Sequence, residues 1–220
     1  MKNAGPHAKT LKSLAKTLMT SSAGAEKPRV DPVTALVAAV LKRNTPDSKA
    51  DKAIQRLQDE FVDFNELRVA TQLELVDLLE DLYKDAGDRI AILLDTLALV
   101  FDNRGRLHLD DIAAMNRREQ RPALKKVNLD PYVEAYVALA SLGIGTVPID
   151  ETSHAHLEQE DVLEPDTDSA EAHKFVESNV KADEAWPFFV GLREAALSAK
   201  PAKKAAKKST KKTTKKTTEK

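Results

Sequence analysis

Residues 126–152 read KVNLDPYVEAYVALASLGIGTVPIDET, and the rest of the chain is arranged around them. Asp130 followed by Pro131 predicts a helix start, because a carboxylate caps the first N–H groups and proline suits the first helical position. Apolar residues at helical spacing then predict a helix with one buried face: Leu129, Val133, Tyr136, Val137 and Ala140. The helix is expected to stop at Gly143, and after a short turn Asp150 follows directly on an apolar anchor.

A second pair of helices is predicted upstream, joined by a short polar turn. Asp31-Pro32 and Thr45-Pro46-Asp47 each combine a capping side chain with a proline, which is typical of a helix start. Apolar residues recur after both caps at helical spacing. Residues 41–53, across the turn, read LKRNTPDSKADKA, with Asn44 at its centre. On these residues alone the turn is a polar connection between two helices.

These stretches together resemble the helix-hairpin-helix (HhH-GPD) DNA glycosylases, in particular endonuclease III. That family has a glycine-rich hairpin, a helix, a short glycine loop and a Val-Asp-Thr-His-like segment with the catalytic aspartate, which Ile149–Thr152 matches. Residues 41–53 are similar to its Leu-Ser-x-Gln-x-Thr-Asp…Asn-Lys-Ala segment. The resemblance implies an all-α glycosylase-like domain that acts in base-excision repair. It implies that Asp150 is the catalytic residue and that Asn44 replaces the Gln that fills the hole left by the extruded base.

The chain departs from the family pattern at three points. Val127–Pro131 falls on the hairpin Leu-Pro-Gly-x-Gly but contains no glycine. Val133 is matched to the lysine nucleophile of bifunctional members, and valine has no amine to form a Schiff base with the opened sugar. Without cysteine, the chain cannot hold the family's four-cysteine iron–sulfur cluster. We therefore expect a monofunctional glycosylase without the lyase step and without a cofactor.

Charge divides the chain into three segments. Residues 1–30 carry a net charge of +5 and residues 200–220 carry +9, so residues 31–199 carry −15 of the total of −1. We expect a basic N-terminal arm (1–30), a helical domain (31–199) and a lysine-rich tail (200–220). The tail has nothing to bury and is predicted to be disordered. The arm is expected to be a mobile leader, the alternative being a short amphipathic helix with Leu11, Leu14 and Leu18 on one face.

Two groups of basic residues are candidates for contact with DNA phosphates, because Lys and Arg supply most of the sequence-independent affinity. The first lies just before residue 127: Arg117, Arg118, Arg121, Lys125 and Lys126. The second is in the tail: Lys203, Lys204, Lys207, Lys208, Lys211, Lys212, Lys215 and Lys216. The expected partner is double-stranded DNA, bound non-specifically by the tail. A solvated helix face and a solubilising tail are the alternatives, and RNA also fits the tail.

Other sites are not favoured by the sequence. His154 and His156 point apart on a helix and do not form a metal pair, so no metal is expected. No apolar run approaches 20 residues, so no membrane span is expected. The basic N-terminus lacks the apolar core of a signal peptide, which favours a cytoplasmic protein, associated with the nucleoid if bacterial. Nothing in the sequence indicates an oligomeric state.

Three functions remain open. The first is a monofunctional glycosylase that uses Asp150. The second is a protein with the glycosylase fold but no catalysis, which binds DNA mainly through its tail. The third is an unrelated all-helical protein whose acidic surface holds a basic partner.

Overall fold

The computed structural model describes residues 4–28 and 30–199, and every regular element within them is a helix. Twelve helices follow one another there: α1 (Ala4–Ser21), α2 (Pro32–Lys42), α3 (Asp47–Glu60), α4 (Phe64–Val69), α5 (Gln72–Leu79), α6 (Ala86–Arg104), α7 (Asp110–Ala114), α8 (Arg117–Lys125), α9 (Pro131–Ala140), α10 (Glu151–Gln159), α11 (Ser169–Asn179) and α12 (Ala185–Ser198). The predicted all-α class is confirmed.

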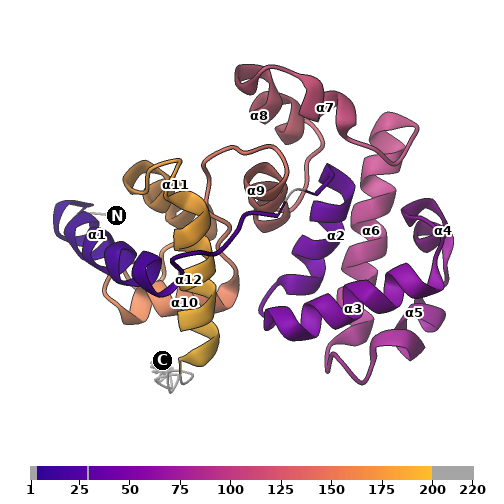
Figure 1. Ribbon diagram of the computed structural model, residues 1–220, viewed down its shortest axis with the longest axis horizontal. Coiled ribbons are helices and arrows are strands. Elements are labelled where there is room, and N and C mark those ends of the chain that lie inside the picture. Colours follow the sequence, from indigo (N-terminus) through magenta and orange to yellow (C-terminus); the bar gives the residue numbers. More distant parts are fainter. Residues whose placement is uncertain (1–3, 29, 200–220) are drawn as a thin grey trace, which may run out of the picture.

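The helices form two groups with α9 between them (Figure 1). One group contains α2 to α6, and the other contains α1 together with α10, α11 and α12, so the two ends of the described chain lie together. Helix α9 packs against α2 in the first group and against α12 in the second. The start of α9 and the start of α10 therefore lie where the two groups meet.

The predicted capping residues start the helices around this junction. Asp31 accepts hydrogen bonds from the N–H groups of Val33 and Thr34 at the start of α2. Asp130 does the same at the start of α9, where proline follows it. These side chains satisfy N–H groups that have no partner within the helix. The sequence around both caps therefore sets where α2 and α9 begin.

The N-terminal segment differs from the mobile leader that we expected. Helix α1 packs against α12 and α11, with Leu11 and Leu18 buried. A Cβ atom on Gly191 of α12 would lie 2.5 Å from the carbonyl oxygen of Leu18, so the two helices cross at a point where only glycine fits. The Ser22 hydroxyl also donates to the carbonyl of Pro187 at 2.6 Å. Burial of this apolar stripe makes the segment part of the domain despite its basic composition.

Small and aliphatic side chains form the interior where α2 and α9 meet. Ala35, Leu36 and Ala39 of α2 and Val137 of α9 are fully buried or nearly so. Alanines on the facing surfaces let the two helices pack closely and hold the starts of α9 and α10 in a fixed relation. None of the helices in the described ranges is both long and apolar enough to cross a bilayer.

Candidate active site at the start of helix α10

Asp150 is the N-cap of α10 and its side chain is almost fully buried. One carboxylate oxygen accepts a hydrogen bond of 2.8 Å from the N–H of Ser153, within the first turn of the helix. The other oxygen accepts one of 2.9 Å from the N–H of Asn44, in the turn between α2 and α3. The two donors come from segments far apart in the chain, and together they fix the orientation of the carboxylate.

Asn44 joins the α2–α3 turn to the first turn of α10. Its backbone is left-handed, with φ of 53°, a conformation that asparagine tolerates better than most residues. Its amide oxygen accepts from the N–H and the hydroxyl of Thr152 at 3.1 and 2.8 Å, and its amide nitrogen donates to Glu151 at 2.7 Å. Both amide atoms are therefore engaged within the protein, although the residue as a whole is exposed.

A cavity of about 460 Å³ opens beside Asp150, between the starts of α9 and α10. Its lining consists of Arg43, Asp130, Pro131, Tyr132, Ile149, Asp150, Glu151, His154, Ala155, Thr167 and Ser169. Tyr132 is buried, and its hydroxyl has no hydrogen-bond partner in the described part of the chain. Burial raises the pKa of Tyr132 well above its ordinary value. The phenol therefore stays neutral next to the carboxylate.

Arg43 connects the starts of α9 and α10 at the mouth of the cavity. One guanidinium nitrogen lies 3.2 Å from a carboxylate oxygen of Asp130, and two others bond the carboxylate of Glu151, Nε at 3.1 Å. The hydrogen bond with Glu151 is the largest cause that raises the pKa of Arg43. Burial acts to raise the pKa of Glu151, but hydrogen bonds from Arg43 and Asn44 lower it to about 2. The guanidinium charge is thus largely neutralised within the protein.

Comparison with known proteins gives matches among solved structures. No family model and no curated protein sequence matches the chain. The structure aligns with a trapped covalent complex of endonuclease III with DNA, at a TM-score of 0.64 and 13% identity, over 86% of this chain and 85% of that one. A thermostable thymine-DNA glycosylase aligns at a TM-score of 0.60 and 17% identity, over 86% of each chain.

The third neighbour is the 8-oxoguanine glycosylase/lyase of Clostridium acetobutylicum in complex with double-stranded DNA, at a TM-score of 0.59 and 19% identity, over 85% of this chain and 69% of that one. The chain has the helix-hairpin-helix DNA glycosylase fold. This confirms the expected architecture.

The segment between α8 and α9, which we matched to the family's hairpin, contains no glycine. Asn128 takes the left-handed conformation, with φ of 62°. The Asp130 carboxylate accepts from the N–H groups of Tyr132 and Val133 at 2.9 and 3.4 Å. The first N–H groups of α9, which form an anion site in an uncapped helix, are therefore bound internally.

The position that we matched to the lyase lysine does not face the cavity. Val133 is buried in the core and does not line the cavity, whereas Tyr132, one residue earlier, does. None of the lining residues is a lysine.

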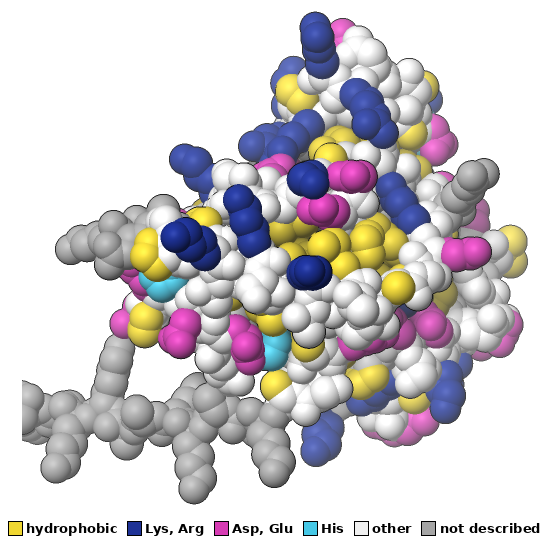
Figure 2. Space-filling view, turned by 60° about the vertical axis from the view of Figure 1, so that its left-hand side comes forward, with side chains coloured by type: hydrophobic (Ala, Val, Ile, Leu, Met, Phe, Trp, Pro, Cys, Tyr) yellow, Lys and Arg dark blue, Asp and Glu magenta, His cyan; other side chains and the backbone are white. Residues whose placement is uncertain are grey.

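The basic residues of α8 do not act as a single patch. Several Lys and Arg side chains gather at the upper end of the molecule, where Figure 1 places α7 and α8 (Figure 2). Arg121 forms an ion pair with Glu177 of α11, which includes a hydrogen bond of 2.8 Å. Arg118, Lys125 and Lys126 are exposed and have no ion pair with a described carboxylate. Lys125 and Lys126 lie at the hairpin end of α8, and Arg117 lies at the other end.

Arg117 is accompanied by Lys27, which sequence reasoning missed. A Cβ atom on Gly143 would lie 3.4 Å from Lys27 Nζ and 3.5 Å from a guanidinium nitrogen of Arg117. Partial burial and the charge of Arg117 lower the pKa of Lys27. Only the folded chain brings these two residues together, so no pattern in the sequence marks them. The tail lysines Lys203 to Lys216 lie outside the described residues.

Proposed function

We propose that the chain is a monofunctional DNA glycosylase in which Asp150 is the catalytic residue. The observation that carries the proposal is the Asp150 carboxylate, held by two backbone N–H groups at the edge of a cavity on a glycosylase fold. By their own descriptions, the three structural neighbours are a glycosylase/lyase with DNA, a covalent complex of endonuclease III with DNA and a thymine-DNA glycosylase, which supports a reaction of the glycosylase type. The cavity lies within the size range of small-molecule sites, so it suits one extruded base.

In the proposed reaction a base leaves the DNA stack and enters the cavity. The bond between the sugar C1′ and the base nitrogen breaks, and the base departs with the bonding electrons. Positive charge then develops on the sugar, and the Asp150 carboxylate stabilises it. A water oxygen bonds to C1′, its proton passes to Asp150, and the departing base is protonated from solvent. The products are a free base and an abasic site in an unbroken strand.

The absence of lysine from the cavity lining supports the monofunctional form of this proposal. A lyase step needs an amine that attacks C1′ and forms a Schiff base. Tyr132 occupies the wall of the cavity, and the raised pKa of its phenol keeps it neutral. A neutral phenol can donate a hydrogen bond to a base or to a water molecule, but it forms no Schiff base.

Binding to double-stranded DNA is proposed to use exposed cations of α8 and of the tail. Lys125, Lys126 and Arg118 have no ion pair with a described carboxylate, and Arg117 stands beside Lys27. Asn44 adjoins the site through its hydrogen bond to Asp150, but its side chain must release Thr152 and Glu151 before it contacts DNA. Because such contacts displace counterions, the affinity is expected to fall steeply with salt.

The test is single-turnover incubation with duplexes that contain an oxidised pyrimidine, a mismatch, uracil or an alkylated base. Alkali then cleaves the strand at each abasic site. We expect strand cleavage after alkali, and none without it, for at least one duplex. Cleavage without alkali would contradict the monofunctional assignment, and no cleavage with any duplex would contradict catalysis.

A second candidate is a DNA-binding protein that has kept the fold and lost the reaction. One observation favours it: Asp130 occupies the first N–H groups of α9 and places a carboxylate where a phosphate would approach. This function predicts salt-sensitive binding to undamaged duplex and no abasic product. It also predicts that removal of residues 200–220 lowers the affinity and the salt dependence. An unaltered salt dependence would exclude the tail as the main contact.

A further inference from the structure

One corner of the α2–α6 group exposes apolar side chains that the proposed site does not use. Val62, Val69 and Leu73 are 94%, 67% and 70% exposed, in the segment that runs from the end of α3 to the start of α5. Most large apolar side chains of the described chain are buried, and the other two exposed ones, Ile92 and Met115, lie on other helices. A concentration of this kind is typical of a surface that another segment covers.

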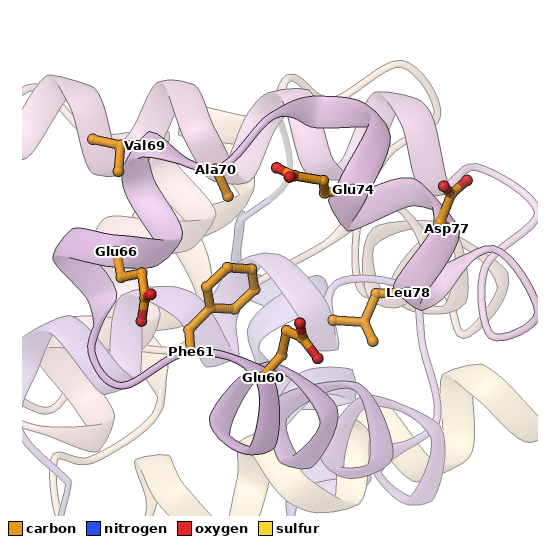
Figure 3. A pocket seen from close by; sticks show the side chains of 8 residues that line it. All are labelled: Glu60, Phe61, Glu66, Val69, Ala70, Glu74, Asp77 and Leu78. Atoms are coloured by element: carbon orange, nitrogen blue, oxygen red, sulfur yellow. The ribbon is translucent and has the colours of Figure 1, made fainter.

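The same corner contains a hollow of about 590 Å³ with an apolar floor and an acidic rim (Figure 3). Phe61, Ala70 and Leu78 face one another across it, and the carboxylates of Glu60 and Glu66 stand on either side of Phe61. The full lining is Glu60, Phe61, Glu66, Val69, Ala70, Glu74, Asp77 and Leu78. The hollow therefore offers apolar contact below and negative charge around the edge.

The negative charge of this rim is only partly engaged within the protein. Glu66 accepts the N–H of Val62 at 2.7 Å, and Glu74 accepts the N–H of Thr71 at 2.8 Å. Neither Glu60 nor Asp77 has an ion pair with a described cation. Residues 57–80 contain seven acidic residues and one basic residue, Arg68, whose guanidinium lies 3.8 Å from the centre of the Phe101 ring. Such a surface repels DNA and attracts a cationic chain.

We propose that residues 200–220 of the same chain bind in this hollow. Their net charge of +9 complements the rim. A lysine side chain can lay its four methylene groups on an apolar surface and keep its ammonium group at the edge. This matches an apolar floor bordered by carboxylates. The tail contains no large apolar residue, so its lysine stems and the methyl groups of its alanines and threonines provide the apolar contact.

The tail can reach far from the point where it leaves α12. The last described helix ends at Ser198, and the 21 residues from Lys200 to Lys220 can span about 70 Å at roughly 3.3 Å each. A tethered segment also has a high effective concentration, which favours weak contacts within one molecule over contacts between molecules. Because the lysines are the ones proposed to bind DNA, the acidic corner and DNA compete for them. This consequence rests on the proposed function, but the contact itself does not.

The contact is tested by methyl NMR spectra of the full chain and of a chain ending at residue 199. We expect the methyl signals of Val69, Ala70 and Leu78, which line the hollow, to differ between the two chains, and the difference to vanish at about 0.5 M salt. Identical methyl signals would overturn the proposal. Signals that change with protein concentration in the full chain would also overturn it, because a second copy would then be the occupant.

Charge variants give the second arm of the test. Glu60→Gln with Asp77→Asn should weaken the methyl differences and raise the affinity for undamaged duplex DNA about three- to fivefold. Asp95→Asn with Glu194→Gln removes the same charge from exposed positions of α6 and α12 and should do neither. An equal effect of both pairs would overturn the proposed site. If Glu60→Gln with Asp77→Asn weakens the methyl differences but leaves the DNA affinity unaltered, the result would support the contact and contradict the role of the tail in DNA binding.

Discussion

The N–H of Asn44 donates a hydrogen bond of 2.9 Å to the carboxylate of Asp150, across 106 residues of sequence. The bond joins the turn between α2 and α3 to the cap of α10, and it depends on the left-handed backbone of Asn44. One helical group therefore helps to orient the carboxylate at the edge of the other group. The position of the proposed catalytic residue is thus a property of the junction and not of α10 alone.

Two substitutions separate the effect of the left-handed backbone at Asn44 on stability from the effect of its side-chain contacts. Asn44→Gly removes the amide contacts with Glu151 and Thr152 but keeps the backbone conformation at no steric cost. Asn44→Ala removes the same contacts and adds strain of about 1 kcal/mol at positive φ. We expect the alanine variant to be less stable than the glycine variant in urea unfolding. Equal stability would contradict the argument that the backbone conformation is what matters.

The ion pair of Arg43 with Glu151 makes stability depend on pH. The folded-state pKa of Glu151 is about 2, below its ordinary 4.5, so the stabilisation is complete above about pH 5 and is lost as pH falls through 4.5 towards 2. Because the pair is partly exposed, we expect it to contribute only about 1 kcal/mol.

Arg43→Gln should remove this acid-dependent part of the unfolding free energy. Arg118→Gln is the control, because it removes an exposed guanidinium that has no ion pair with a described carboxylate. The measurement is urea unfolding between pH 2 and pH 7 for the wild type and both variants. The same pH profile in Arg43→Gln as in the wild type would contradict the assignment.

Helix α1 is expected to be a structural part of the domain. Leu11 is fully buried, so Leu11→Ala should lower the unfolding free energy by about 2–5 kcal/mol. Lys12→Ala changes the exposed neighbour in the same helix and should have little effect. Thermal unfolding of both variants makes the comparison. Equal melting temperatures would show that α1 is not held in place by its apolar face.

Removal of the Tyr132 hydroxyl is expected to affect stability and activity differently. It is buried without a hydrogen-bond partner in the described chain, which costs free energy. Tyr132→Phe should therefore unfold at the same temperature as the wild type or at a higher one. If the hydroxyl donates to a bound base or water, the same variant should cleave about tenfold more slowly. A destabilised variant would show that the hydroxyl has a structural partner.

The sequence was sufficient for the helical class, for the starts of α2 and α9, and for the helix-hairpin-helix glycosylase fold. Helix caps are local, so Asp31 and Asp130 reveal them without any knowledge of packing. The environment of the site could not be predicted in this way. Arg43 meets Asp130 and Glu151, and Lys27 meets Arg117, only because helices from distant segments converge.

Two mistaken expectations have the same origin in tertiary contacts. Helix α1 is basic and its apolar stripe is short, so composition favoured a mobile leader until α12 supplied a surface for it. The α8 cations were read as one patch, but Glu177 of α11 takes up Arg121, and Arg117 lies at the opposite end of the helix from Lys125. Contacts between helices decide both outcomes.

The most direct test of the central claim is single-turnover base excision by Asp150→Asn, on whichever duplex the wild type cleaves best. Asparagine caps a helix as well as aspartate does, so the substitution removes the charge and keeps the cap of α10. Its amide nitrogen cannot accept the hydrogen bond from the N–H of Asn44, so the melting temperature of the variant is measured alongside the rate. Asp168→Asn makes the same change at the cap of α11 and is the matched control. The account predicts a loss of about 100-fold or more in the first variant and little change in the second. Equal rates for Asp150→Asn and the wild type would contradict it.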